Sequence, residues 1–293
     1  MTAPARRLTV VSGKGGTGKT VVSASFAVLA GDCVLADCDV DAADLHLLFQ
    51  PEVLERHEFS GGSIAVRDPG PCTDCGRCRE VCRFDAVTES FDIDPVACEG
   101  CGFCARACPA GAIRMTPAVN GEWFVSRVRC GMMVHARLGP AEENSGKLVT
   151  AVRKRAAAIA ADRGARYVIA DGPPGIGCPV IAAITGAEMV LAVAEPSLSG
   201  IHDLKRVAEV AGRFGIRAGC LVNRFDINPG NARALEDWCR ENGVEVVGRV
   251  PYDEAVTRAV VAGRTVVEGE SSPARSAIEA AWRKVAECLA ETK

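Results

Sequence analysis

The protein has 293 residues, of which 48% are hydrophobic and 24% charged, and its net charge is −3 at pH 7. A chain of this length has room for one large α/β domain and a small module with a core of its own. It lacks the basic excess of nucleic-acid-binding proteins, and no apolar run approaches the ~20 residues of a membrane span. We therefore expect a cytoplasmic protein with no nucleic-acid partner and no membrane span.

A glycine-rich loop at residues 13–20 follows a predicted strand at residues 8–11 and precedes a predicted helix from residue 21. Its spacing matches the P-loop pattern, in which Gly and four further residues precede Gly-Lys-Ser/Thr. Glycines let backbone amides and the positive end of the helix point at one phosphate group. Lys19 is then placed to neutralise the β- and γ-phosphates, and Thr20 to bind Mg²⁺ through its hydroxyl. The predicted nucleotide-binding residues of the loop are Gly13, Gly15, Gly16, Thr17, Gly18, Lys19 and Thr20.

Two further predicted strands end in carboxylates. Residues 33–39 read as a buried parallel strand that ends in Asp37 and Asp39, and residues 167–171 as another that ends in Asp171. Ligands bind at the carboxyl edge of such sheets, so these acids are candidate site residues. One of Asp37, Asp39 and Asp41 can instead serve as a helix N-cap.

The chain contains fifteen cysteines. Cytosolic thiols stay reduced, so the spacing of these cysteines predicts metal binding rather than disulfides. After linker-like residues 60–63 and 68–71, the pattern Cys-x2-Cys-x2-Cys-x3-Cys occurs twice. In two-cluster bacterial ferredoxins the fourth cysteine of each run ligates the other cluster. We therefore assign one 4Fe–4S cluster to Cys72, Cys75, Cys78 and Cys108, and a second to Cys98, Cys101, Cys104 and Cys82.

Structural zinc is the alternative for these cysteines, because paired Cys-x-x-Cys motifs also bind it. The third cysteine after two residues and the fourth after three, repeated twice, favour iron–sulfur clusters. Arg83 follows Cys82 where the motif usually has Pro. This arginine predicts a cation near one cluster, which favours the reduced form of that cluster.

The rest of the chain continues an α/β alternation. Strands are predicted at residues 189–194, 219–224 and 246–251, and helices at residues 199–213, 233–241 and 273–289. A hairpin is predicted at residues 122–138, with Cys130 at its turn and outside both cysteine runs.

On these residues the chain resembles the MinD/ParA/nitrogenase-iron-protein class of P-loop ATPases, and Lys14 marks the deviant P-loop of that class. The resemblance implies that Lys14 reaches the nucleotide of a partner, in an ATP-dependent homodimer or a heterodimer with a related ATPase. It also implies that Asp39 positions the attacking water, that Asp171 holds Mg²⁺ through water, and that Gly175 senses the γ-phosphate. The implied catalytic residues are Lys14, Lys19, Asp39 and Asp171, and the implied adenine-side residues are Asn223, Arg224, Pro251 and Asp253.

Cys178 follows Asp171 at a place similar to that of a cysteine in the nitrogenase iron protein, which ligates a cluster shared between two subunits. By this resemblance, Cys178 is a candidate metal or cluster site at a dimer interface. The alternative is a small packing thiol, because free cysteine packs well in protein interiors.

We predict a doubly wound, mostly parallel α/β P-loop NTPase with an inserted small α+β ferredoxin-like domain. The ATPase domain would comprise residues 1–61 and 119–293, and the inserted domain residues 62–118. The cofactors expected are ATP, Mg²⁺ and two 4Fe–4S clusters. The predicted function is an ATPase whose nucleotide state is coupled to electron transfer, or to cluster assembly and delivery to a partner protein. The alternative is a nucleotide-switched regulator or scaffold whose clusters sense redox state.

Overall fold

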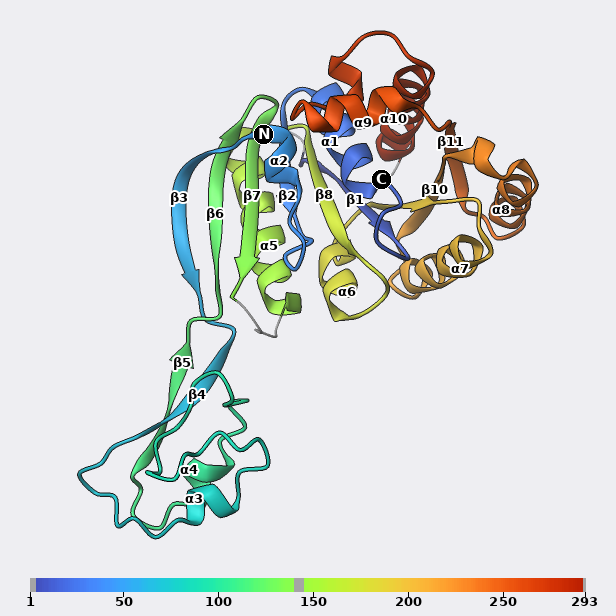
Figure 1. The fold of residues 1–293 in the computed structure, drawn as a ribbon. Helices are drawn as coiled ribbons and strands as arrows, with labels where there is room; N and C mark the ends of the chain where they lie inside the picture. Colours follow the sequence, from blue (N-terminus) through green and yellow to red (C-terminus); the bar gives the residue numbers. More distant parts are fainter. Residues whose placement is uncertain (1–3, 140–144, 292–293) are drawn as a thin grey trace. The chain divides into compact units, whose positions relative to one another are not determined.

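The computed structural model describes residues 4–139 and 145–291, and within them nine strands form one sheet (Figure 1). The strands from one edge to the other are β11 (Glu245–Val250), β10 (Arg217–Asn223), β9 (Met189–Ala194), β1 (Arg6–Ser12), β8 (Tyr167–Pro174), β2 (Cys33–Asp37), β7 (Gly131–Leu138), β6 (Gly121–Val128) and β3 (Glu52–Phe59). From β11 to β7, each strand pairs in parallel with its neighbours. This parallel, non-sequential order is a doubly wound α/β sheet, as the sequence predicts.

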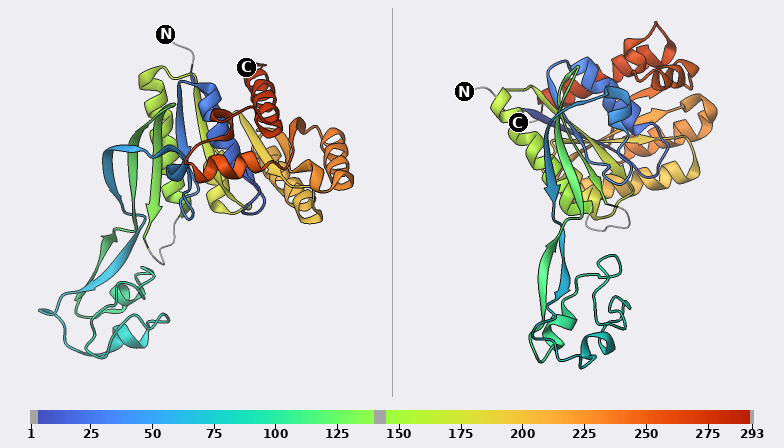
Figure 2. Two further views of the ribbon diagram at one scale, coloured as in Figure 1. Left: turned by 45° about the horizontal axis from the view of Figure 1, so that its top comes forward. Right: turned by 60° about the vertical axis from the view of Figure 1, so that its left-hand side comes forward.

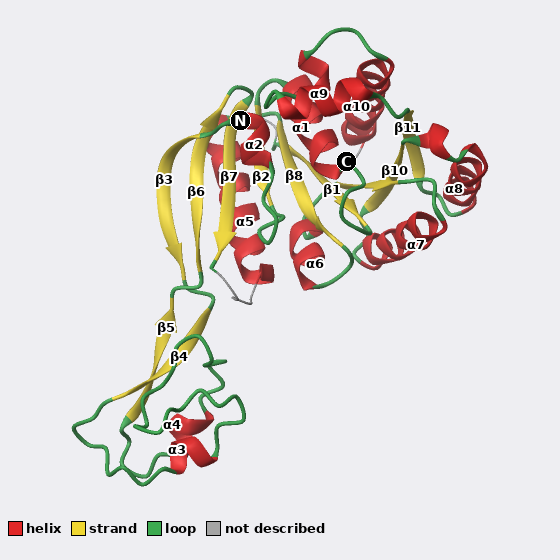
Figure 3. Ribbon diagram, in the orientation of Figure 1, coloured by secondary structure: helices red, strands yellow, loops and turns green. Residues whose placement is uncertain are grey.

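Helices flank both faces of this sheet (Figures 2 and 3). They are α1 (Lys19–Ala30), α2 (Leu45–Phe49), α5 (Ser145–Arg163), α6 (Cys178–Ile184), α7 (Leu198–Arg213), α8 (Pro229–Glu241), α9 (Glu254–Val261) and α10 (Pro273–Glu291), with short 3-10 helices η1 (Phe225–Ile227) and η2 (Val266–Glu268). Helices α1 and α10 pack on one face, and α5, α6, α7 and α8 on the other. Within the described residues, no helix combines the length and the apolar character needed to cross a membrane.

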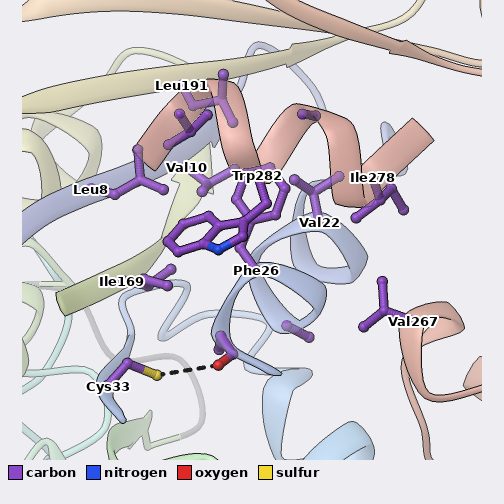
Figure 4. Close-up of a cluster of buried hydrophobic side chains, with 14 of the residues drawn as sticks. Leu8, Val10, Val22, Phe26, Cys33, Ile169, Leu191, Val267, Ile278 and Trp282 are labelled. Carbon is purple, nitrogen blue, oxygen red and sulfur yellow. Dashed lines mark hydrogen bonds between the residues drawn. The ribbon is translucent and has the colours of Figure 1, made fainter. Parts of the chain in front are cut away.

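Alternate side chains of β1 enter different cores. Leu8 and Val10 pack with Phe26 of α1 and Trp282 of α10 (Figure 4). The ring centroids of Phe26 and Trp282 are 5.2 Å apart. Val11, the next residue of the strand, belongs to the core on the opposite face. Both faces of the strand are therefore buried, which explains why its sequence is an apolar run.

The carboxyl ends of the parallel strands meet at one edge of the sheet. Strand β2 ends there at Asp37, and the register places Asp37 opposite Asp171 of β8. Strand β1 ends at the same edge with Ser12, directly before the glycine-rich loop. The sheet therefore brings the predicted loop and the predicted acids together.

The chain divides into two compact units. The larger unit comprises the described parts of Met1–Arg56, Trp123–Arg137 and Ser145–Lys293. The smaller unit comprises His57–Glu122 and the described part of Leu138–Asn144.

The smaller unit contains an antiparallel pair of strands, β4 (Gly62–Arg67) and β5 (Ile113–Ala118), and two short helices, α3 (Arg77–Glu80) and α4 (Phe103–Ala107). The register runs from Gly62 opposite Ala118 to Arg67 opposite Ile113. The prediction of a linker at residues 60–63 is therefore wrong in part, because β4 begins at Gly62. Backbone pairing with β5 replaces the expected linker from Gly62 onward. The partner strand is far away in the sequence, so the local glycine content cannot reveal this pairing.

Candidate nucleotide and cysteine sites

The P-loop connects β1 to α1. Gly16 and Gly18 have φ values of 81° and 91°, in the left-handed region that favours glycine. Helix α1 begins at Lys19, so the unpaired amides of its first turn lie at the end of the loop. Loop amides and the helix N-terminus together form an anion site of the kind that binds phosphate.

Side chains from other elements hold this loop in shape. Asn223, at the end of β10, donates from Nδ2 to the carbonyl oxygen of Thr17 at 2.7 Å. A Cβ at Gly18 would lie 2.5 Å from Asn223 Nδ2, and a Cβ at Gly13 would lie 1.9 Å from Asp203 Cβ. Thr17 Oγ1 is buried and has no hydrogen-bond partner among the described residues. Such a hydroxyl is available to a phosphate oxygen.

Lys19, Asp39 and Asp171 form a buried charged cluster. Lys19 Nζ lies 3.1 Å from Asp39 Oδ2 and 3.1 Å from Asp171 Oδ1. Thr20 Oγ1 donates to Asp171 Oδ2 at 2.8 Å, and Ser23 Oγ donates to Asp171 Oδ1 at 2.8 Å. The structure therefore brings together four of the residues predicted from the P-loop and from the strand ends.

Carboxylates outnumber ammonium groups in this cluster. Asp37 is fully buried and accepts hydrogen bonds from the amides of Asp39 and Leu45, both at 3.3 Å. Burial raises the pKa of Asp37 well above its usual value, and the charge of Asp171 adds to this effect. Burial also raises the pKa of Asp39, although Lys19 opposes the shift. An excess of carboxylate oxygens suits Mg²⁺, which prefers oxygen ligands.

The deviant lysine is paired within its own chain. Lys14 Nζ lies 3.3 Å from Glu195 Oε2, and Arg224 Nη1 donates to Glu195 Oε1 at 2.6 Å. Glu195 follows β9 at the carboxyl edge of the sheet. The structure thus places Lys14 and Arg224 on one carboxylate, with Asn223 bonded to the loop backbone.

Strand β8 extends to Pro174, beyond the predicted strand at residues 167–171, so the loop that contains Gly175 begins later than expected. Gly175 directly follows β8 and has a φ of 91°. Its amide donates to the carbonyl oxygen of Ser12 at 2.8 Å. This bond ties the start of the loop to the end of β1, next to the P-loop.

Pro251 and Asp253 lie in the connection between β11 and α9. Asp253 caps α9 by accepting a hydrogen bond from the amide of Ala255 at 2.8 Å. Its other oxygen accepts from the amide of Ala274, at the start of α10, at 3.2 Å. These amides hold the pKa of Asp253 below its usual value. In the structure Asp253 therefore organises two helix starts.

Four cysteines assigned to the first cluster line one cavity of the smaller unit, and three of them come from the first run. They are Cys72, Cys75, Cys78 and Cys108. Gly76, with a φ of 73°, precedes α3 between two of these cysteines, and the side chain of Phe91 closes part of the cavity wall. Residues from both cysteine runs therefore meet at one cavity.

The cysteines assigned to the second cluster also lie near one another. Burial raises the pKa of the Cys104 thiol, and the charges of Cys98, Cys101 and Cys82 raise it further. Among the described residues, no three His, Cys, Asp or Glu side chains are placed to hold a single metal ion. A cubane gives each thiolate its own iron, so its thiolates stand farther apart than the ligands of one ion.

The family described as CbiA, CobQ/CobB/MinD/ParA nucleotide binding domain, matches residues 8–266. The chain belongs to this family. It is an ATP-binding P-loop ATPase of the MinD/ParA type, which confirms that part of the prediction.

Relatives of this MinD/ParA-type ATPase include two that match it over different lengths. It is 29% identical to the uncharacterized protein MJ0578 of Methanocaldococcus jannaschii over 292 residues, covering 97% of each protein. It is 33% identical over 85 residues to the light-independent protochlorophyllide reductase iron-sulfur ATP-binding protein of Chloroflexus aggregans. That match covers 28% of this chain and 31% of the relative.

Solved structures of MinD proteins share the fold of this ATPase. The MinD protein of Pyrococcus horikoshii, in complex with Mg-ADP, matches with a TM-score of 0.59 at 18% identity, covering 98% of each chain. The Pyrococcus furiosus cell division ATPase MinD matches with a TM-score of 0.59 at 20% identity, covering 97% of this chain and 99% of that one. The doubly wound α/β fold is thus shared although few residues are identical.

Several residues of the ATPase site were not predicted from the sequence. Ser23 anchors Asp171 from one turn beyond Lys19, and Glu195 holds Lys14. The place of Glu195 directly after a buried strand was a usable signal, because strand ends carry the site in this fold. The contact between Asp203 and Gly13 had no such signal, since it depends on where α7 packs.

Cys178 and Cys130, the two remaining cysteines of interest, differ in exposure. Cys178 begins α6 and is exposed, with its Cβ 3.7 Å from the position of a Cβ built on Gly146. The alternative of a buried packing thiol is therefore wrong for Cys178. Cys130 is buried at the turn between β6 and β7, and its carbonyl oxygen lies 3.6 Å from Cys33 Sγ. Cys130 thus packs in the core of the larger unit.

Proposed function

We propose that this ATPase couples its nucleotide state to electron transfer, or to the assembly and delivery of a metal or iron–sulfur cluster to a partner protein. One observation carries the proposal: four cysteines from two separate runs line one cavity in a chain that also has a P-loop site. The Chloroflexus aggregans relative is named as an iron-sulfur ATP-binding protein. This name supports the proposal that iron–sulfur clusters and an ATP site occur together in this chain. Fifteen free cysteines suit a reducing compartment, so we place the protein in the cytoplasm.

Two 4Fe–4S clusters are the cofactors we propose for the smaller unit. Cys72, Cys75, Cys78 and Cys108 would hold one, and Cys98, Cys101, Cys104 and Cys82 the other. The cavity also presents Arg67 Nε, a buried donor with no hydrogen-bond partner among the described residues, and a cluster sulfur accepts such donors. Bound clusters supply one-electron redox chemistry.

We propose that residues 62–118 are a ferredoxin-like domain inserted into an ATPase domain of residues 1–61 and 119–293. The antiparallel pairing of β4 and β5 places Gly62 opposite Ala118. The two ends of the insert therefore meet, and a domain whose ends meet can be inserted into another without opening it.

We propose that ATP and Mg²⁺ bind at the P-loop and that two chains then associate, either two copies or a copy and a related ATPase. Thr20, Asp39 and Asp171 would surround Mg²⁺, and Gly175 would sense the γ-phosphate. Asn223, Arg224, Pro251 and Asp253 would lie on the adenine side. Lys14 would exchange Glu195 for the nucleotide of the partner, and Cys178 would lie at the interface.

The first test is anaerobic EPR of the dithionite-reduced full chain with and without ATP and Mg²⁺, together with iron and acid-labile sulfide counts. We expect about eight irons per chain and a spectrum or midpoint potential that changes with nucleotide. Cys78→Ser and Cys104→Ser should each remove roughly half of these irons, whereas Cys178→Ser should leave them in place, because Cys178 belongs to a separate candidate site at the dimer interface. A protein that binds zinc instead of iron and sulfide contradicts the proposal. Clusters that are indifferent to nucleotide would favour the regulator or scaffold.

A further inference from the structure

Arg67 lies beside the four cysteines assigned to the first cluster, which we call the first set; the four assigned to the second cluster are the second set. It is the last residue of β4 and lines the same cavity as Cys72, Cys75, Cys78 and Cys108. Its partner in the β4–β5 ladder, Ile113, lines that cavity as well. The Arg67 side chain is 14% exposed, so a charged group from a strand is largely buried against the cavity.

The guanidinium of Arg67 makes three polar contacts. Nη1 lies 3.5 Å from Cys72 Sγ and 3.1 Å from Asp74 Oδ1, and Nη2 lies 3.3 Å from Asp92 Oδ1. Nε is buried and has no hydrogen-bond partner among the described residues. Arg67 therefore places a positive charge on the sulfur of one proposed ligand and keeps one donor free.

A nearby positive charge and N–H donors to sulfur stabilise the more negative, reduced form of a cluster, which raises its reduction potential. Asp74 and Asp92 oppose this effect, and Asp74 Oδ1 also lies 3.5 Å from Cys72 Sγ, but the two carboxylate side chains are 69% and 65% exposed. Water screens exposed charges more strongly than buried ones, so the guanidinium has the larger influence on the cavity.

Among the described residues, no contact like that of Arg67 with Cys72 is found at the cysteines assigned to the second cluster. Within the part of the chain that the structure describes, no Lys or Arg side chain donates a hydrogen bond to the thiols of Cys82, Cys98, Cys101 and Cys104. Arg83 follows Cys82, but its Cζ lies 6.0 Å from the ring centroid of Phe84, over that ring. The arginine that contacts a proposed ligand is thus Arg67, on the other set.

We propose that Arg67 makes the two clusters unequal, so that the cluster held by Cys72, Cys75, Cys78 and Cys108 has the higher reduction potential and is reduced first. The inference rests on the two clusters of the proposed function. When two clusters in one small unit differ in reduction potential, an electron resides mainly on the cluster of higher potential. Two clusters of equal potential would share the electron equally.

The test is a potentiometric EPR titration of the full chain with both clusters loaded, as shown by iron and sulfide counts. We expect two midpoint potentials in the wild type. Arg67→Gln, which removes the charge but keeps a side-chain donor, should lower the higher midpoint and leave the lower one unchanged. Arg79→Gln is the matched control, because Arg79 pairs with Glu89 through exposed side chains and should shift neither midpoint.

Two further variants separate charge from structure. Arg67→Lys keeps the charge and should retain most of the higher midpoint. Asp74→Asn removes an opposing charge and should raise the same midpoint, and asparagine tolerates the left-handed backbone of Asp74, with its φ of 51°. If Arg67→Gln loses iron, its midpoints cannot be compared with those of the wild type. The shift of the higher midpoint in Asp74→Asn is then the test of the inference.

The inference is overturned if loaded Arg67→Gln keeps both midpoints, if both fall equally, or if Asp74→Asn leaves them unchanged. A wild-type protein without iron and sulfide overturns the proposed function instead. The two failures are therefore distinguishable by the metal count.

Discussion

Lys19 Nζ lies 3.1 Å from Asp171 Oδ1, so the P-loop lysine and the proposed magnesium-binding aspartate neutralise each other. Asp39 completes the arrangement at the same distance from Nζ. When a nucleotide binds, the ammonium is expected to turn toward the phosphates, and Mg²⁺ to take over the charge of the carboxylates. The ion pairs of the buried cluster would then exchange for contacts with the nucleotide and the metal ion.

Lys19→Ala should abolish ATP binding, because it removes the cation that neutralises the phosphates. It should also lower the free energy of unfolding by about 3–5 kcal/mol, since two buried carboxylates lose their partner. Binding of a fluorescent ATP analogue and urea unfolding measure the two effects. Iron and sulfide should stay at the wild-type level.

Lys14→Ala is the control for Lys19. Its ion pair with Glu195 involves a side chain that is 41% exposed, so unfolding should change by about 1 kcal/mol or less. ATP binding to a single chain should persist. Loss of iron in Lys19→Ala, or loss of ATP binding in Lys14→Ala at high protein dilution, would contradict these roles.

Gly18→Ala should disturb the P-loop from both sides. Its φ of 91° disfavours any Cβ, and that Cβ would lie 2.5 Å from Asn223 Nδ2. Backbone strain and the lost bond to Thr17 should lower the free energy of unfolding by about 1–3 kcal/mol and weaken ATP binding. Gly15→Ala is the stability control, because a Cβ at Gly15 would have no atom within 4 Å among the described residues. Equal unfolding free energies for the two variants would contradict this prediction, because they would show that the loop changes conformation to accommodate the methyl group at residue 18.

Stability should depend on pH through Glu268. Burial alone would raise the pKa of Glu268, but hydrogen bonds from Arg129 and Thr265 lower this pKa to about 2. The folded pKa lies below the usual value of 4.5, so this stabilisation is complete above that pH and is lost as the pH falls toward 2. With partial exposure taken into account, it is about 1–2 kcal/mol.

Glu268→Gln tests this dependence. Urea unfolding at pH 7 should show the loss of about 1–2 kcal/mol, and the difference from the wild type should shrink as the pH approaches 2. In a double-mutant cycle with Arg129→Gln the two losses should not add, because Arg129 Nη2 and Glu268 Oε2 bond directly at 2.6 Å. Arg129→Gln alone should cost more than Glu268→Gln, since Arg129 also donates to the carbonyl oxygen of Leu48 at 2.8 Å. A constant difference across the pH range would rule out the ionised pair as its source.

Cys178 should report dimer formation. Its thiol is exposed, so alkylation by iodoacetamide should be fast in the free chain and several-fold slower with Mg²⁺ and a non-hydrolysable ATP analogue. Mass spectrometry of the peptide that contains Cys178 separates it from the other cysteines. Light scattering on the same samples provides the dimer fraction. Unchanged labelling in a protein that dimerises would place Cys178 outside the interface.

Several elements were predictable because their signals are local. The strand, loop and helix around Lys19 appear where predicted, and α10 begins at Pro273 as expected. Strand β3 was not predicted: its pattern is largely exposed and charged, so it lacks the apolar alternation that marks a strand. Strand β4 was also not predicted, because it begins with glycine and serine, which are typical of loops.

The sequence by itself determined which groups of the P-loop can bind phosphate and Mg²⁺ and which thiols we propose for the clusters, because the P-loop and both cysteine runs place these groups at short spacings along the chain. Only the tertiary structure decided which distant groups meet. The parallel register set Asp37 opposite Asp171, and the packing of β4 brought Arg67 to Cys72. Such contacts depend on how strands pair and helices pack over the whole chain, and no local pattern encodes them.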